Sequence, residues 1–179
     1  MHLATHTEGD VFPAQTNQSY TDPVVYEDRL TGKGIILDKD GDVALIGNRV
    51  NTFLTLPGGG IDDGETIEQG IIRECREEAG CDVELLHNIG YVDDYRPRDK
   101  KHCITHCYIA GIVGKKRSSD LTQDEVKNGF HVIWVPMSEA LRISEKQIAQ
   151  LRSGEVIFYN TGFNILRDAL FLKVASEKV

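Results

Sequence analysis

The sequence predicts an α/β fold, with strands in the first three quarters of the chain and helices around them. Three observations predict it. Short apolar runs bounded by Gly, Pro and Asp are typical of strands. An amphipathic segment at residues 66–79 interrupts these runs, and further amphipathic segments end the chain. With 179 residues, of which 40% are hydrophobic and 27% charged, the chain is expected to form one soluble domain over residues 20–179.

The first elements are a short hairpin and a glycine-rich loop. Residues 1–19 show no periodicity, and we expect either a loose N-terminal arm or a short edge strand there. The apolar runs at 35–37 and 43–46 flank an Asp-Gly pair, which predicts a β-hairpin. A short strand is expected at 53–56. It leads into the loop 57–60, whose glycines allow the backbone to approach a ligand closely.

The segment 66–79 has legible helix boundaries. Thr66 and Gln69 fit a capping box at its start, and Gly80 supplies a left-handed cap at its end. Ile71 and Cys75 continue an apolar stripe at i+4 spacing, which predicts that one helix face is buried.

The later elements follow the same two patterns, strands first and helices last. We expect strands at 83–92, 102–113 and 130–135, a helical turn at 138–141, and helices at 144–151 and 161–174.

Three carboxylates crowd one side of the predicted helix. Glu74, Glu77 and Glu78 stand at i, i+3 and i+4, directly after Arg73. At about 100° per residue they share one arc of the helix, where they repel each other unless a cation compensates. Such oxygen-rich clusters suit Mg²⁺ or Mn²⁺. The alternative is a solvated acidic face.

The glycine loop and this helix share one spacing pattern. It reads Gly59-x5-Glu65-x7-Arg73-Glu74-Cys75-x-Glu77-Glu78-x-Gly80-Cys81. This resembles the Nudix box of the MutT-like Nudix hydrolases, G-x5-E-x7-R-E-U-x-E-E-x-G-U, where U is apolar. Cysteine at both U positions is a mild departure, because free cysteine packs as a small hydrophobe. The resemblance implies an α/β/α sandwich with a mixed sheet, and hydrolysis of a diphosphate bond in a nucleoside-linked substrate.

The resemblance also implies roles for the residues of the box. Glu74, Glu77 and Glu78 would hold Mg²⁺ (or Mn²⁺), with the Gly58 carbonyl as a further ligand. Arg73 would orient these carboxylates and offset their repulsion.

Glu65 is expected to pair with Arg73 and act structurally. Two assignments stay open at the level of sequence: the catalytic base and the cations that bind substrate phosphates. The base that activates water could be Glu74, or an acidic residue of a later loop, Asp124 or Glu125, for which a solvated loop is the alternative reading. Cations that could bind substrate phosphates are Arg49, Arg96, Arg98, Lys100 and Lys101.

The substrate class rests on one loop. Pro97 stands where ADP-ribose-cleaving relatives carry a proline, but basic residues follow it. These favour a nucleoside or deoxynucleoside triphosphate, cleaved to monophosphate and pyrophosphate. Alternatives are ADP-ribose or a nucleotide sugar, dinucleoside polyphosphates or capped RNA ends, and a non-catalytic nucleotide-binding module.

Composition argues against several classes of partner. The net charge of −8 does not favour duplex nucleic acid, and no apolar run is long enough for a membrane span or secretion signal. We therefore expect a cytoplasmic protein with free cysteines. Cys103 and Cys107 should share one strand face rather than bind zinc. The sequence leaves open whether the chain forms a homodimer, and whether the helices after Leu141 bind another protein.

Overall fold

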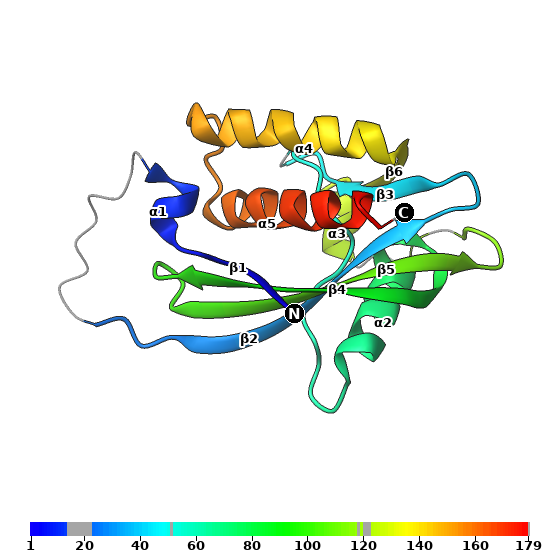
Figure 1. Cartoon of the computed structure of the whole chain (residues 1–179), viewed down its shortest axis with the longest axis horizontal. Coiled ribbons are helices and arrows are strands. Elements are labelled where there is room, and N and C mark those ends of the chain that lie inside the picture. The colour runs from blue at the N-terminus through cyan, green and yellow to red at the C-terminus, as the bar shows by residue number, and fades with distance from the viewer. Residues whose placement is uncertain (14–22, 51, 118, 120–122, 179) are drawn as a thin grey trace.

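The computed structural model describes residues 1–13, 23–50, 52–117, 119 and 123–178, and within these it gives no side-chain account of residues 124 and 125. A mixed sheet lies at the centre (Figure 1). Its strands run in the spatial order β1-β4-β5-β2-β3-β6, with β1 parallel to β4, β2 parallel to β5, and the other neighbours antiparallel. The strands are β1 (His2–His6), β2 (Glu27–Leu37), β3 (Asp42–Gly47), β4 (Asp82–Arg96), β5 (Lys101–Val113) and β6 (His131–Pro136).

Helices cover both faces of this sheet. Figure 1 shows α2 (Ile67–Ala79) on one face, and α4 (Met137–Arg152) and α5 (Tyr159–Ser176) on the other. The fold also has two short helices, α1 (Glu8–Val11), which contacts β1 and α5, and α3 (Gln123–Lys127). The predicted α/β/α sandwich with a mixed sheet is confirmed.

Strand β2 separates the two faces by simple alternation. Gly32 and Gly34 face α2, where an added Cβ would lie 2.4 Å from Ile71 Cγ1 and 2.6 Å from Cys75 Sγ, respectively. Their missing side chains let the helix pack close against the sheet. The odd-numbered residues of β2, including Lys33 and Ile35, point to the opposite face, which α5 covers.

Strand β5 shows the predicted alternation as well. Cys103, Thr105 and Cys107 are buried, whereas His102 and His106 are half-buried on the opposite face. All four cysteines are free and buried. Within the described residues, no group of three or more His, Cys, Asp or Glu side chains is arranged to hold a metal ion.

The helix predicted at 66–79 forms with its expected caps. The Thr66 hydroxyl accepts a hydrogen bond from the backbone N–H of Gln69, and Gly80 adopts a left-handed conformation with φ of 63°. The predicted hairpin forms between β2 and β3.

The strand expected at 53–56 is reduced to a single bridge between Thr55 and Ile46. Side chains of the helices α4 and α5 form hydrogen bonds with the backbone of this segment instead. The Gln147 amide bonds to both the N–H and the C=O of Leu54, at 2.7 and 2.9 Å, and Asp168 accepts from Leu56 N at 2.9 Å. Long-range polar contacts therefore replace a strand ladder there.

Three other boundaries differ from those predicted. The turn at 138–141 and the helix at 144–151 are one continuous helix, α4, because no Gly or Pro separates them. Of the two alternatives for the N-terminus, residues 2–6 form the edge strand β1, followed by α1. The stretch read as a loop around residues 124 and 125 contains α3. No helix among the described residues has the length and apolar character to cross a membrane.

Candidate active site

The guanidinium of Arg73 is the centre of a network of carboxylates on α2 and the loop before it. It donates to both oxygens of Glu65, at 2.9 and 3.0 Å, to Glu74 at 2.8 Å and to Glu77 at 3.2 Å. A further bond of 2.9 Å reaches the Gly60 carbonyl. The contacts with Glu65, and then Glu74, raise the pKa of Arg73 above its ordinary value, and Arg73 in turn lowers the pKa of Glu65. One arginine thus holds the helix carboxylates against the glycine loop.

The glycine loop approaches these carboxylates closely. The Gly58 amide donates to Glu78 Oε2 at 2.6 Å. A Cβ on Gly59 would lie 2.6–2.9 Å from the atoms of the Glu74 carboxyl group. Gly58 itself has φ of +132°, and a Cβ there would lie 2.1 Å from the Gly32 carbonyl oxygen. This arrangement therefore depends on glycine at both positions.

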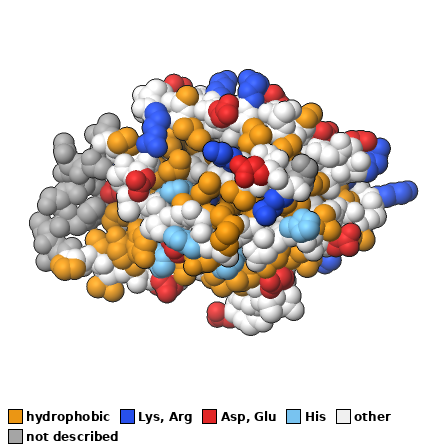
Figure 2. All heavy atoms as spheres, viewed as in Figure 1, with side chains coloured by type: hydrophobic (Ala, Val, Ile, Leu, Met, Phe, Trp, Pro, Cys, Tyr) orange, Lys and Arg blue, Asp and Glu red, His pale blue; other side chains and the backbone are white. Residues whose placement is uncertain are grey.

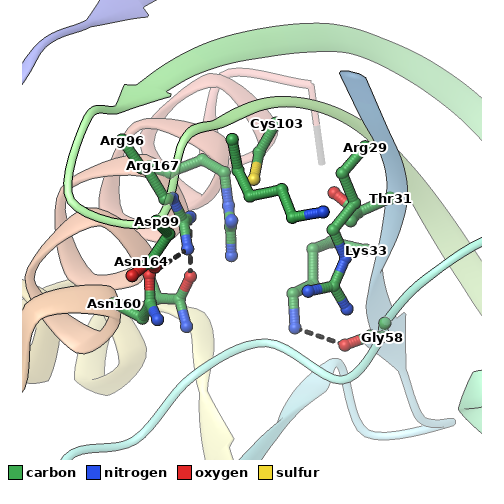
Figure 3. Close-up of a pocket in the computed structure, with 12 residues that line it drawn as sticks. Arg29, Thr31, Lys33, Gly58, Arg96, Asp99, Cys103, Asn160, Asn164 and Arg167 are labelled. Carbon is green, nitrogen blue, oxygen red and sulfur yellow. Dashed lines mark hydrogen bonds between the residues drawn. The ribbon is translucent and has the colours of Figure 1, made fainter. Parts of the chain in front are cut away.

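A basic pocket of about 240 Å³ adjoins the loop on the sheet face that α5 covers (Figure 3). Figure 3 shows Arg29, Lys33 and Gly58 along one side, with Asn160 and Asn164 opposite. The basic residues that line the pocket are Arg29, Lys33, Arg96, Lys101 and Arg167.

A family model, the NUDIX domain, matches residues 29–154. The chain belongs to the NUDIX family.

Individual relatives of this NUDIX domain are similar over only part of their length. An ADP-ribose pyrophosphatase from Methanocaldococcus jannaschii is 30% identical over 82 residues, which cover 44% of this chain and 48% of that protein. An 8-oxo-dGTP diphosphatase from Proteus vulgaris is 39% identical over 54 residues, covering 28% of this chain and 48% of that protein. The chain thus spans about half the length of these curated relatives. A NUDIX hydrolase from Nitrosomonas europaea shares the fold, with a TM-score of 0.55, 16% identity, and coverage of 72% of this chain and 90% of that one.

Nudix hydrolases generally use a divalent metal, and the donor chemistry of this NUDIX domain fits one. Glu74, Glu77 and Glu78 provide hard oxygen ligands whose negative charge exceeds the single positive charge of Arg73. They do not form a ready cage in the described structure, because Arg73 and the Gly58 amide hold them in separate hydrogen bonds. An ion would therefore have to draw them together.

The Gly58 carbonyl, expected as a further ligand, already has a partner. The buried ammonium of Lys33 donates to it at 2.6 Å and to the Leu56 carbonyl at 2.8 Å. A carbonyl oxygen has two lone pairs, so Gly58 retains one for a cation. Lys33 was not singled out from the sequence.

The cations predicted to bind phosphate are separated in the structure. Arg96 and Lys101 line the pocket. Arg98 instead pairs with Glu8 at 2.5 Å and lies over the Tyr159 ring. The remaining ones lie elsewhere: Arg49 beside Gly129, and Lys100, exposed, in the β4–β5 turn. The side chains of Asp124 and Glu125, candidates for the base, lie outside the described residues.

Residues that sequence reasoning missed come from two distant elements. Arg29 and Lys33 lie on β2, whereas Asn160, Asn164 and Arg167 lie on α5. For Arg29 and Lys33 the signal is alternation: odd-numbered residues of β2 share a face with the buried odd-numbered residues of β5, to which β2 is parallel.

A buried aspartate, Asp94, holds two arginines of the pocket, Arg96 and Arg167. It accepts from Arg96 at 2.9 Å and from His6 at 3.2 Å, and lies 3.6 Å from Arg167. Arg167 also pairs with Asp168 at 2.8 Å. Burial opposes the charged form of Asp94, but the His6 hydrogen bond and the charges of Arg167 and Arg96 hold its pKa below the ordinary value. Arg96 and Arg167 are therefore fixed in position before any ligand binds.

Replacing this aspartate should make stability less dependent on pH. Because the pKa of Asp94 is lower in the folded than in the unfolded chain, its stabilisation is complete above about pH 4 and is lost as pH falls through the folded-state value. We expect Asp94→Asn to lower the free energy of unfolding by about 2 kcal/mol at pH 7, and by less at pH 3. Urea unfolding of both proteins from pH 7 to pH 3 measures this. An unchanged gap at pH 3 would contradict it.

Proposed function

We propose that this chain is a Nudix hydrolase that uses a divalent cation to cleave a diphosphate bond in a nucleotide. The observation that carries the proposal is the Arg73 network, which gathers Glu65, Glu74 and Glu77 at the glycine loop beside a basic pocket. Two relatives are named for related activities, ADP-ribose pyrophosphatase and 8-oxo-dGTP diphosphatase.

In this proposal the residues of the Nudix box have two roles, cation binding and orientation of the carboxylates. Glu74, Glu77 and Glu78, with the Gly58 carbonyl, hold Mg²⁺ or Mn²⁺. The bound cation supplies neutralisation of the diphosphate charge. Arg73 orients the carboxylates and offsets their repulsion, and its contacts with Glu65 and the Gly60 carbonyl hold its guanidinium in place.

The attacking water needs a base near the diphosphate. Glu74 is our candidate, because its carboxyl group lies against the Gly59 backbone and its side chain is only 15% exposed. Cleavage needs mainly charge neutralisation and positioning, which such a site can supply.

For the substrate we propose a nucleoside or deoxynucleoside triphosphate, which water would cleave to the monophosphate and pyrophosphate. The excess of cations in the pocket supports a substrate with several phosphates. ADP-ribose or a nucleotide sugar is the second candidate, which the 30% identical ADP-ribose pyrophosphatase favours.

A substrate panel should separate the two. With Mg²⁺ present, we expect dNTPs, including oxidised dNTPs, to be turned over at least about tenfold more efficiently than ADP-ribose, NADH or diadenosine polyphosphates. Chromatography should identify monophosphate and pyrophosphate as the products. Efficient turnover of ADP-ribose with inert triphosphates would reject the preferred class.

The proposal extends to partners and place. We propose a small nucleotide rather than duplex nucleic acid as the ligand, and a cytoplasmic site of action. Light scattering after size exclusion would show whether the chain is a homodimer.

A further inference from the structure

The basic pocket concentrates positive charge in a chain whose net charge is −8. No carboxylate pairs with Arg29 within the described residues. The ammonium of Lys33 donates to two carbonyl oxygens, which leave its charge unneutralised. On the face seen in Figure 2, acidic and basic side chains are interspersed. A buried, uncompensated ammonium is costly unless an anion comes close.

Most hydrogen-bonding side chains that line the pocket are donors, although the Asp99 carboxylate also lines it. The side-chain oxygens of Asn160 and Asn164 both accept from the Arg96 guanidinium, at 3.0 and 3.3 Å. Their NH₂ groups are then left for a ligand. Arg96 Nε is buried and, within the described structure, has no partner. A wall of donors fits phosphate oxygens, which only accept, better than the edge of a nucleobase, which carries both donors and acceptors.

A base would also lack a surface on which to stack. Of the described residues that line the pocket, none is aromatic. The nearby rings are already covered by arginines: Arg96 lies 5.0 Å from the Phe163 ring centre, and Arg98 lies 4.5 Å from that of Tyr159. Base-binding sites generally rely on a free aromatic face.

The pocket is continuous with the proposed catalytic centre. A Cβ on Gly60 would lie 3.7 Å from Arg29 Nη2, and the Gly60 carbonyl accepts from Arg73. Gly58 and Gly59, which contact Glu78 and Glu74, also line the pocket. A diphosphate held at the carboxylates would therefore have its next phosphate within reach of Arg29.

From these contacts we infer that the pocket binds a phosphate group of the substrate beyond the diphosphate that is cleaved, and not the nucleobase. The inference rests on the proposed function for the position of that diphosphate. Two chemistries supply such a group: the terminal phosphate of a triphosphate, or a phosphomonoester elsewhere on the substrate, such as the 2′-phosphate of NADPH.

Calorimetry without metal tests the pocket independently of catalysis. In EDTA, inorganic pyrophosphate is expected to bind and guanosine is not. Arg29→Gln should weaken pyrophosphate binding about tenfold, because it removes one charge-assisted donor from an exposed position that the fold does not need. Lys39→Gln removes the same charge from a side chain that is 87% exposed at the β2–β3 turn, and should leave binding unchanged. Pyrophosphate binding that Arg29→Gln does not alter, or guanosine binding of equal affinity, would overturn the inference.

Turnover of matched pairs identifies the source of the phosphate. We expect kcat/KM to be at least about tenfold higher for dGTP than for dGDP, or for NADPH than for NADH, with the preference reduced in Arg29→Gln. Preference in the first pair assigns the terminal phosphate, and in the second the phosphomonoester. Equal kcat/KM within both pairs would overturn the inference. If no pair is hydrolysed, the proposed function has failed, and calorimetry alone decides the pocket.

Discussion

Glutamine in place of Glu77 or Glu78 is expected to lower turnover at least about a hundredfold while the fold is preserved. Each substitution removes one negative charge from the proposed cation site, where charge develops in the transition state. The amide retains an oxygen that can accept from Arg73 or from the Gly58 N–H, so the hydrogen bonds at 3.2 and 2.6 Å can persist. Steady-state kinetics with saturating Mg²⁺ measures the effect, and circular dichroism checks the fold.

Asp62→Asn is the matched control. The substitution also removes one negative charge. However, the Asp62 carboxylate lies 3.7 Å from Arg73, and its side chain is 74% exposed. Its exposed ion pair contributes little. We expect turnover within about twofold of the unchanged protein. Near-normal turnover in both glutamate variants would reject the metal site that we propose.

Alanine at Gly58 is expected to destabilise the whole molecule. The new methyl group would lie 2.1 Å from the Gly32 carbonyl oxygen, at a backbone φ of +132° that residues with a Cβ rarely adopt. Backbone cannot give way as a flexible side chain does, so strain and collision add. We expect the free energy of unfolding to fall by about 3 kcal/mol or more, which thermal unfolding would show as a melting temperature lower by about 10 °C.

Gly41→Ala separates the two causes. Gly41 also has a positive φ, of +81°, but nothing lies within 4 Å of its added Cβ. Gly41→Ala should therefore lower the free energy of unfolding by only about 1 kcal/mol, from backbone strain alone. Equal melting temperatures for the two variants would show that the contact between the loop and β2 contributes nothing.

The part of the site that the sequence predicts is the part built from near neighbours. Arg73 contacts Glu77 one turn further along its own helix, its neighbour Glu74, and Glu65 just before the Thr66 cap, so helix geometry and the helix boundary are enough to bring them together. The caps at Thr66 and Gly80 are local in the same sense.

The basic pocket could not be predicted in this way. It depends on the parallel pairing of β2 with β5, in which Glu27 lies opposite Lys101, and on α5 packing over both strands. Local sequence does not determine such a register. It also could not show that Arg98 is drawn away to Glu8 on α1, while Arg96 remains in the pocket.

The same parallel pairing has a consequence for how the protein folds. Antiparallel β2 and β3 are joined by a tight turn and can pair early. The pairing of β2 with β5 must close a loop of more than 60 residues, including all of α2, before it gains any stabilisation. Arg167 follows later still. During synthesis, β2 and α2 would therefore emerge before Arg96, Lys101 and Arg167, and the pocket, which needs residues from both ends of the chain, would be among the last features to assemble.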